Sequence, residues 1–274
     1  MASTIGSHGA IAVVAYDIIE GLNRTTRNGG SGVMLDLHCH ILPEVDDGAA
    51  SLDEALAMSR FCVLDGITHV VATPHCHHLT RLLRSDILPQ VTRLNEKLTL
   101  AGVPLTILAG SEVQVSDTAA YRSDFEASLY CHLGDGRAFT LLEFPWKEEL
   151  YPADAPELVS WLHRQGMTAI IAHPERQSFF EVNSKRLQAL VEAGAWLQVT
   201  ADSLLGNHGP APRSFGEKLR SYSEVVLATD AHNLRRCSGL SAGYVWVEER
   251  FGAQRADELR SQAQLVLSAL VGVA

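Results

Sequence analysis

The sequence predicts an α/β fold, a distorted (β/α)7 TIM-like barrel with a metal cluster at the C-terminal mouth of its strands. Seven short apolar runs typical of β-strands are mostly separated by amphipathic helical stretches, an order that favours a parallel sheet. Six of the seven runs carry a His, Asp or Glu at or just past their C-terminal end. In a β/α barrel, this end of the strands is where functional sites are built.

Helix signals separate most of the expected strands. A capping box at 51–54 begins the first helix, and a last amphipathic helix is expected at 257–270. Glycines, which commonly stop helices, follow four apolar stripes at Gly66, Gly102, Gly166 and Gly194. The expected strands cover residues 33–37, 68–73, 105–109, 139–144, 167–172, 195–200 and 224–229.

Composition limits the classes of function. The 274 residues are 46% hydrophobic, which is ordinary for a protein with a sizeable core. The formal net charge of −10 argues against a nucleic-acid or anionic-membrane partner, although metals and arginines can still attract an anionic substrate. Five cysteines without C-x-x-C spacing, and no apolar run of about 20 residues, predict a soluble cytoplasmic protein. Residues 1–33 are expected to be a flexible extension and residues 34–274 a single domain.

Histidines and carboxylates recur at the strand ends. His38 and His40 are spaced i, i+2, so an extended backbone points both rings to the same side. Such a pair alone is as compatible with buried or solvated rings as with a metal site. Seven further groups follow this pair along the chain, and nine groups are too many for one ion but suit two or three ions about 3.5–4 Å apart. The candidate ligands are His38, His40, Asp47, His75, Glu112, Glu143, His173, Asp230 and His232.

The donor types and nearby arginines indicate a chemistry. Nitrogen and oxygen donors without thiolate favour manganese, iron or zinc in a catalytic cluster. Arg176, Arg235 and Arg236 lie a few residues from His173 or His232, and a guanidinium there could hold two phosphate oxygens. An arginine in such a place can equally be solvated or ion-paired. Metal clusters of this kind produce hydroxide at neutral pH and support in-line displacement at phosphorus.

Six motifs in this order resemble one known family. They are H-x-H-I-L-P-x-x-D-D-G, T-P-H, G-x-E-V, L-L-E-F-P, A-H-P-E-R and D-A-H, and the match runs from about residue 34 to 239. The chain resembles the bacterial PHP-domain tyrosine-protein phosphatases of the polymerase and histidinol phosphatase superfamily. These proteins are associated with capsular or exopolysaccharide biosynthesis.

The resemblance implies a reaction, a metal and a role for each motif residue. A metal-bound hydroxide would hydrolyse phosphotyrosine. The substrate would be a bacterial tyrosine kinase of polysaccharide synthesis. The cofactors would be two or three divalent metal ions, with manganese more expected than iron or zinc. Arg176 would bind the phosphoryl group and Arg236 would be the second arginine, although Arg235 stays an alternative. One ion would be held by His38, His40, Glu112 and Asp230, a second by Glu112, Glu143 and His173, and a third by Asp47, His75 and His232.

Three alternatives stay open at the level of sequence. The chain could be a PHP phosphoesterase for a small phosphomonoester such as histidinol phosphate, or a non-catalytic barrel that binds a kinase. Residues 76–80, which follow the T-P-H motif, also depart from the family pattern, so the sequence does not indicate which phosphotyrosine protein is the substrate. Finally, 131–137 fits C-x5-R, the spacing of cysteine-based phosphatases, but a strand rather than a helix follows it.

Overall fold

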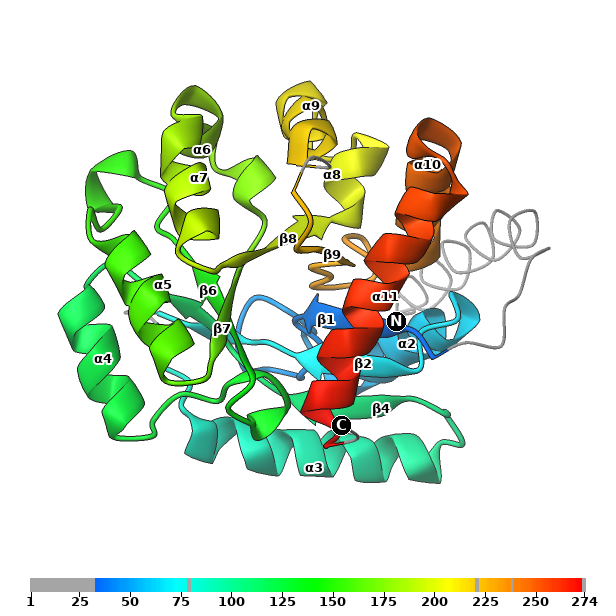
Figure 1. Cartoon of the computed structure of the whole chain (residues 1–274). Coiled ribbons are helices and arrows are strands. Elements are labelled where there is room, and N and C mark those ends of the chain that lie inside the picture. Colours follow the sequence, from blue (N-terminus) through cyan, green and yellow to red (C-terminus); the bar gives the residue numbers. More distant parts are fainter. Residues whose placement is uncertain (1–32, 78–79, 220–221, 238, 273–274) are drawn as a thin grey trace, which may run out of the picture. The chain divides into compact units, whose positions relative to one another are not determined.

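Every pairing between the named strands is parallel in the computed structural model (Figure 1). The structure describes residues 33–77, 80–219, 222–237 and 239–272, so nearly all of the expected extension at 1–33 lies outside the described residues. Within them the strands are β1 (Leu35–Cys39), β2 (His69–Ala72), β3 (His75–Cys76), β4 (Thr106–Ala109), β5 (Glu112–Gln114), β6 (Phe139–Glu143), β7 (Thr168–Ile171), β8 (Trp196–Thr200) and β9 (Val225–Ala228).

These strands form two sheets, in the orders β1-β2-β4 and β3-β5-β6-β7-β8-β9. The seven expected strands are all present, but two of them continue after a bend as the short strands β3 and β5. Pro74 interrupts the first, because proline has no N–H to give to a sheet. Gly110 interrupts the second, and a Cβ atom there would lie 2.7 Å from Val71 Cγ1. The short strands β3 and β5 therefore lie beyond the expected ranges 68–73 and 105–109 and were not predicted from the sequence.

The first and last strands meet at their C-terminal ends. A bridge joins Cys39 to Ala231, and the His40 N–H donates to the Ala231 carbonyl at 2.8 Å. The Asp230 N–H donates to the His38 carbonyl at 2.9 Å. Because of these bonds, two candidate ligand segments nearly 200 residues apart in the chain lie side by side.

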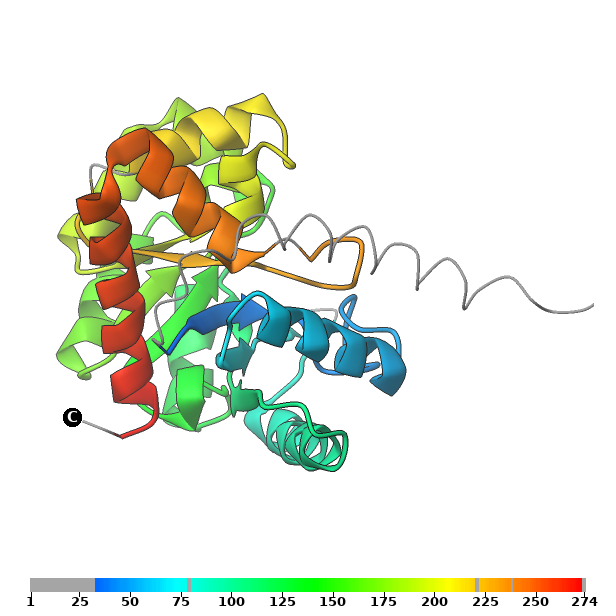
Figure 2. The ribbon, with the colours of Figure 1, turned by 90° about the vertical axis from the view of Figure 1, so that its right-hand side faces the viewer.

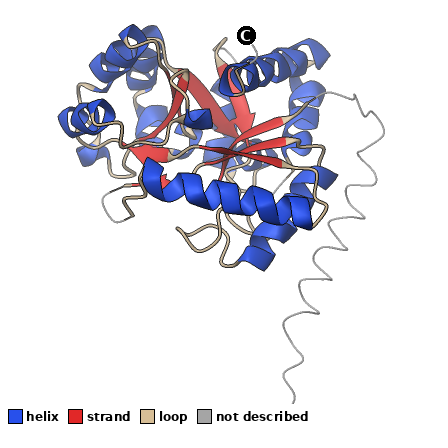
Figure 3. Ribbon diagram, turned by 90° about the horizontal axis from the view of Figure 1, so that it is seen from below, coloured by secondary structure: helices blue, strands red, loops and turns tan. Residues whose placement is uncertain are grey.

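Helices surround the strands (Figure 3). The capping box forms as expected, since Ser51 Oγ accepts from the Glu54 N–H at 3.2 Å. The last helix begins at Ala253 rather than 257 and packs against β1 and β9 (Figure 2). The helices are α2 (Leu52–Leu64), α3 (Arg84–Leu100), α4 (Thr118–Glu126), α5 (Ala155–Arg164), α6 (Ser178–Val182), α7 (Ser184–Glu192), α8 (Ala201–Leu205), α9 (Pro210–Leu219), α10 (Leu240–Phe251) and α11 (Ala253–Leu270).

The sequence patterns did not indicate α4, α6, α8, α9 or α10. Most of these helices have ten residues or fewer, and helices this short depend on tertiary packing rather than on their own pattern. Across the described ranges, no helix combines the length and the apolarity that crossing a bilayer requires.

Two apolar clusters hold the strands in place. The larger one fills the space between strands and helices. The smaller one takes alternate side chains from β1, β6 and β9, such as Leu37, Leu141 and Val226, together with Val266 and Leu267 of α11. Such buried aliphatic side chains contribute roughly 1.5–3 kcal/mol each, as an upper estimate. The clusters fix the strand ends that carry the candidate ligands.

Candidate metal centre

The structure brings all nine side chains expected as ligands into one cluster near the C-terminal ends of β1, β2, β4, β6, β7 and β9. They come from β1 and its loop, from β3, β5 and β6, and from the segments that follow β7 and β9. Most of them are almost completely buried. The cluster consists of His38, His40, Asp47, His75, Glu112, Glu143, His173, Asp230 and His232.

The spacing of the donor atoms suits metal coordination. His38 Nε2 and His40 Nε2 lie 3.2 Å apart, and Glu112 Oε2 lies 3.4 Å and 3.5 Å from them. Donors bound at 2.0–2.1 Å to one ion lie about 3 Å from each other. Three sets of donors have all their atoms within 4.8 Å: His38, His40 and Glu112; His75, Glu112 and Glu143; and His40, Asp47, His75 and His232.

Glu112 lies at the centre of the cluster. Its Oε1 lies 2.8 Å from His173 Nε2 and its Oε2 lies 2.9 Å from His75 Nδ1. Although fully buried, neither Glu112 Oε2 nor Asp230 Oδ1 has a hydrogen-bond partner among the described residues. A buried oxygen without a partner is costly, and a bound cation is one arrangement that satisfies it. The donor set therefore fits divalent metal ions.

The environment of the two central carboxylates, Glu112 and Asp230, favours a positive charge between them. Burial alone would raise the pKa of Glu112 and of Asp230, but the charge of His38, together with the neighbouring imidazoles of His40 and His173, holds both pKa values well below their usual range. Burial likewise opposes the charge on His38, but Glu112 and Asp230 raise its pKa to about 8. The carboxylates thus stabilise any cation placed between them, whether an imidazolium or a metal ion.

The third set of donors reaches solvent through Asp47. Asp47 Oδ1 lies 3.4 Å from His75 Nε2 and 3.5 Å from His232 Nε2. The Asp47 side chain is 62% exposed, whereas that of Glu112 is fully buried. An ion held by this set would be the one that an incoming substrate reaches first.

His75 and His173 differ from the grouping that the resemblance implies. His75, rather than His173, falls in one set with Glu112 and Glu143. His173 Nε2 is still close to both carboxylates, at 2.8 Å from Glu112 Oε1 and 3.9 Å from Glu143 Oε1. Gln114 Nε2 donates to Glu143 Oε2 at 2.9 Å and holds that carboxylate in position.

Asp46 supports His40 and was not among the expected site residues. Its Oδ2 accepts from His40 Nδ1 at 2.7 Å and from the His75 N–H at 3.0 Å, and its Oδ1 accepts from the Gly48 N–H at 2.9 Å. With Nδ1 bonded to Asp46, His40 presents Nε2 to the cluster. Gly48 is required in this turn, because a Cβ atom there would lie 2.1 Å from the His40 carbonyl oxygen. The D-D-G motif therefore combines a candidate ligand, a carboxylate that orients another and a turn.

We expect Asp46→Ala to weaken metal binding about 10- to 100-fold, the loss typical of removing a carboxylate that orients a ligand histidine. Titration of the purified protein with Mn²⁺ measures the affinity. Asp53→Ala removes an exposed carboxylate from the first turn of α2 and serves as the control. Equal affinities in the two variants would show that Asp46 has no part in orienting His40.

Gln198 plays a similar part from β8, the one of the seven expected strands with no candidate ligand at or just past its C-terminal end. Its side-chain Oε1 lies 2.9 Å from His38 Nδ1 and accepts from the His173 N–H at 3.1 Å. A buried glutamine in an otherwise apolar strand was the signal available in the sequence. With Nδ1 bonded to Gln198, His38 also presents Nε2 to the cluster.

Two candidate ligands have left-handed backbones. His173 has a φ of 31° and Asp230 a φ of 52°, values that cost energy for residues other than glycine. Asp36, buried in β1, accepts hydrogen bonds from the N–H and the hydroxyl of Thr229 and so fixes the backbone just before Asp230. Long-range contacts thus maintain a strained backbone at the cluster.

The arginines are not equivalent in the structure. Arg176, in a 3-10 turn at Pro174–Arg176, forms an ion pair with Asp230 Oδ2. Arg236 Nη2 lies 3.9 Å from the same oxygen, with its side chain 43% exposed. Arg235 is exposed, and its backbone N–H donates to Asn233 Oδ1. The positions of the guanidinium groups favour Arg236 over Arg235 as the partner of Arg176.

Comparisons with known proteins identify the family of this chain. Residues 34–267 match the model of a family described as capsular polysaccharide synthesis, CpsB/CapC. The chain belongs to the CpsB/CapC family. It is 33% identical to the tyrosine-protein phosphatase YwqE of Bacillus subtilis over 240 residues, 85% of this chain and 91% of that protein. It is 27% identical to the tyrosine-protein phosphatase CpsB of Streptococcus pneumoniae over 239 residues, 82% of this chain and 94% of that protein.

Solved structures also resemble this CpsB/CapC chain in fold. One match, with a TM-score of 0.80 and 31% identity, covers 86% of this chain and 95% of the other. It comes from crystal structures of YwqE and CpsB, described as metal-dependent tyrosine phosphatases. A phosphotriesterase homology protein from Escherichia coli matches at a TM-score of 0.55 and 11% identity, over 86% of this chain and 99% of the other, which indicates a shared fold alone.

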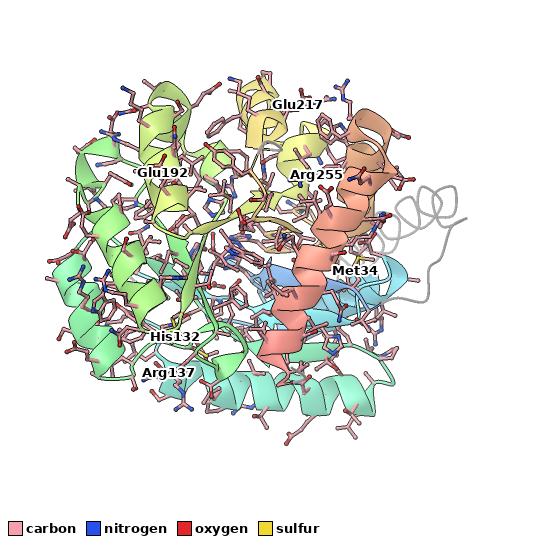
Figure 4. All side chains as sticks on the ribbon, in the orientation of Figure 1. Met34, His132, Arg137, Glu192, Glu217 and Arg255 are labelled. Atoms are coloured by element: carbon pink, nitrogen blue, oxygen red, sulfur yellow. The ribbon has the colours of Figure 1, made fainter. Side chains whose placement is uncertain are left out.

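The C-x5-R segment of this CpsB/CapC member does not form a phosphate loop. Cys131 is fully buried, and burial raises the pKa of its thiol to about 12. Figure 4 shows His132 and Arg137 near each other, before the start of β6. A strand rather than a helix follows the segment, so it lacks the helix N-terminus that would lower the thiol pKa in a cysteine-based phosphatase.

We expect Cys131→Ser to leave kcat/KM for a phosphotyrosine peptide within about twofold of the wild-type value, because a protonated buried thiol is not a nucleophile. EDTA should abolish turnover in both proteins. Steady-state kinetics at saturating Mn²⁺ checks the expectation. An inactive but folded Cys131→Ser protein, together with turnover that resists EDTA, would assign the chemistry to the thiol.

Proposed function

We propose that this chain is a metal-dependent protein-tyrosine phosphatase. The observation that carries the proposal is the cluster of three overlapping donor sets around Glu112, with Arg176 beside it. The names of its relatives, tyrosine-protein phosphatases at 27–33% identity, support the same reaction. The match to a structure described as a metal-dependent tyrosine phosphatase supports the cofactor.

The nine clustered side chains would hold two or three divalent ions. Their nitrogen and oxygen atoms, without thiolate, suit manganese, iron or zinc, and we place manganese first because of the resemblance to the family. Bound there, such ions would supply hydroxide at neutral pH and stabilise the oxygens that enter and leave at phosphorus. In this proposal the metals are held by His38, His40, Asp47, His75, Glu112, Glu143, His173, Asp230 and His232.

The arginines would bind and orient the phosphoryl group. Arg176 already has a fixed position against Asp230, with its side chain 18% exposed, and Arg236 approaches the same carboxylate from the solvent side. A planar guanidinium can donate to two phosphoryl oxygens at once. The leaving group would be a phenol with an ordinary pKa near 10, which departs more easily than an alkyl alcohol and makes a dedicated general acid less necessary.

The substrate class follows from the same relatives. We infer a phosphotyrosine protein, in particular a bacterial tyrosine kinase of capsular or exopolysaccharide synthesis, encountered in the cytoplasm. The five cysteines are all unpaired thiols, which fits a reducing compartment.

We also infer that the two sheets form one distorted barrel of the PHP type over residues 34–274. In this barrel, β2 with β3 would form one bent strand and β4 with β5 another, which gives seven barrel strands in all. The bridge from Cys39 to Ala231 supports closure of the barrel between its first strand and its last. This arrangement would place every candidate ligand at one mouth.

Kinetics together with metal analysis tests the function. We expect the purified chain to contain Mn, Fe or Zn, to hydrolyse a phosphotyrosine peptide, and to lose that activity in EDTA and regain it with Mn²⁺. Histidinol phosphate should be a poor substrate. A strong preference for the small ester would replace the proposal by a small-molecule phosphoesterase. A chain that neither binds metal nor hydrolyses phosphotyrosine when metals are added would favour a kinase-binding protein.

A further inference from the structure

Trp146 is an exposed aromatic side chain beside the metal-ligand cluster. It follows β6 at the end of the L-L-E-F-P motif, and its side chain is half exposed, whereas Phe144 is fully buried. Among the described residues it is the only exposed tryptophan, tyrosine or phenylalanine. Single exposed apolar residues are common on protein surfaces, so the contacts of this indole ring matter more than its exposure.

The ring contacts both a candidate ligand and the phosphate-binding arginine. It is nearly parallel to the imidazole of His173, with an interplanar angle of 13° and 5.5 Å between centroids. The guanidinium carbon of Arg176 lies 5.2 Å from the centroid of the Trp146 ring. These two contacts hold the indole in one orientation while half of its surface stays open to solvent.

We propose that Trp146 contacts the phenol ring of the substrate and selects aryl over alkyl phosphates. The inference rests on the proposed function, because it assumes that a phosphoryl group binds at Arg176. In phosphotyrosine a single oxygen atom separates phosphorus from the ring. A phosphoryl group held by Arg176 therefore places that ring within reach of the indole, at the 4.5–7 Å centroid separation typical of aromatic pairs. An alkyl phosphate offers no such face.

The size of the selectivity follows from ordinary aromatic pairing. Such a pair is worth about a threefold to tenfold difference in affinity. This preference adds to the chemical advantage of a phenol leaving group and acts on binding, so it should change KM more than kcat.

A structural role for Trp146 would have different consequences. If the indole only orients Arg176 or covers His173, its loss should weaken aryl and alkyl ligands alike. If it contacts the substrate ring, only aryl ligands should lose affinity. Two ligands that share a phosphonate group and differ only in the ring distinguish these cases.

The experiment compares phenylphosphonate and methylphosphonate, which are not hydrolysed, by calorimetric titration of the manganese-loaded protein. We expect the wild type to bind phenylphosphonate more tightly. Trp146→Ala should lose about threefold to tenfold in affinity for phenylphosphonate and less than twofold for methylphosphonate. Trp146→Phe should keep most of the preference. Leu150→Ala, which removes another exposed apolar side chain from the same loop, should bind both ligands as the wild type does.

An equal loss for both phosphonates in Trp146→Ala, or no loss for either, would overturn the inference. Metal content, measured in every variant, shows whether the cluster itself is intact. Failure of the proposed function is a separate result, because the wild type would then leave a phosphotyrosine peptide unhydrolysed whatever its preference between the two phosphonates.

Discussion

Glu112→Gln is expected to lose bound metal and to reduce kcat/KM for a phosphotyrosine peptide by more than about a hundredfold. Glu112 belongs to two of the three donor sets, and its Oε1 lies 2.8 Å from His173 Nε2. Glutamine keeps the shape but removes the charge that stabilises neighbouring cations. Even groups that only orient a ligand typically account for 10- to 100-fold in affinity or activity, so a shared ligand should account for more.

Metal analysis after gel filtration, followed by kinetics over a range of Mn²⁺ concentrations, measures both effects. Glu192→Gln is the matched control, because this exposed carboxylate at the end of α7 (Figure 4) accepts, within the described part of the chain, one hydrogen bond, from Gln188 four residues away. Full metal occupancy and normal turnover in Glu112→Gln would exclude Glu112 as a shared ligand.

Arg176→Ala is expected to lower kcat/KM by about 10²- to 10³-fold at saturating Mn²⁺, the loss typical of removing one preorganised donor to a developing anion. Arg176→Lys should recover only part of this loss, because an ammonium cannot make two parallel hydrogen bonds. The ion pair with Asp230 adds a second effect. Without Arg176, metal affinity should fall about tenfold, as for other outer partners of ligands.

Saturating metal separates the two effects. If excess Mn²⁺ restores near-normal kcat/KM in Arg176→Ala, the arginine only orients Asp230 and the phosphoryl group must be held by other groups. Arg84→Lys provides the control. It changes a similar two-pronged pair, in which Arg84 donates to Asp135 at 2.6 Å and 2.8 Å, but at an exposed position.

Most of the strand framework could be predicted from the sequence because its signals are local. Apolar runs of five or six residues, glycine stops and a capping box depend on neighbours in the chain. The short helices α8 and α9 and the division into two sheets could not be predicted in this way. The helices depend on tertiary packing. The division into two sheets depends on Pro74 and Gly110, which interrupt strand pairing only once the neighbouring strands are in place.

The same distinction applies to the site. His38, Glu112 and Asp230 were recognisable because parallel strands bring their C-terminal ends together, so that residue type and strand position suffice. Which groups orient them was not recognisable. Gln198 contacts His38 across 160 residues, and Asp46 reaches His40 only because of the turn at Gly48.

The sequence by itself therefore determined the kind of chemistry, the candidate ligands and the strands that carry them. The tertiary structure alone decided which carboxylate lies at the centre, which arginine faces Asp230 and that Trp146 stays exposed beside His173. The physical reason is that ligand identity depends on a side chain and its strand position. Coordination geometry, charge balance and exposure instead depend on distances between atoms far apart in the chain.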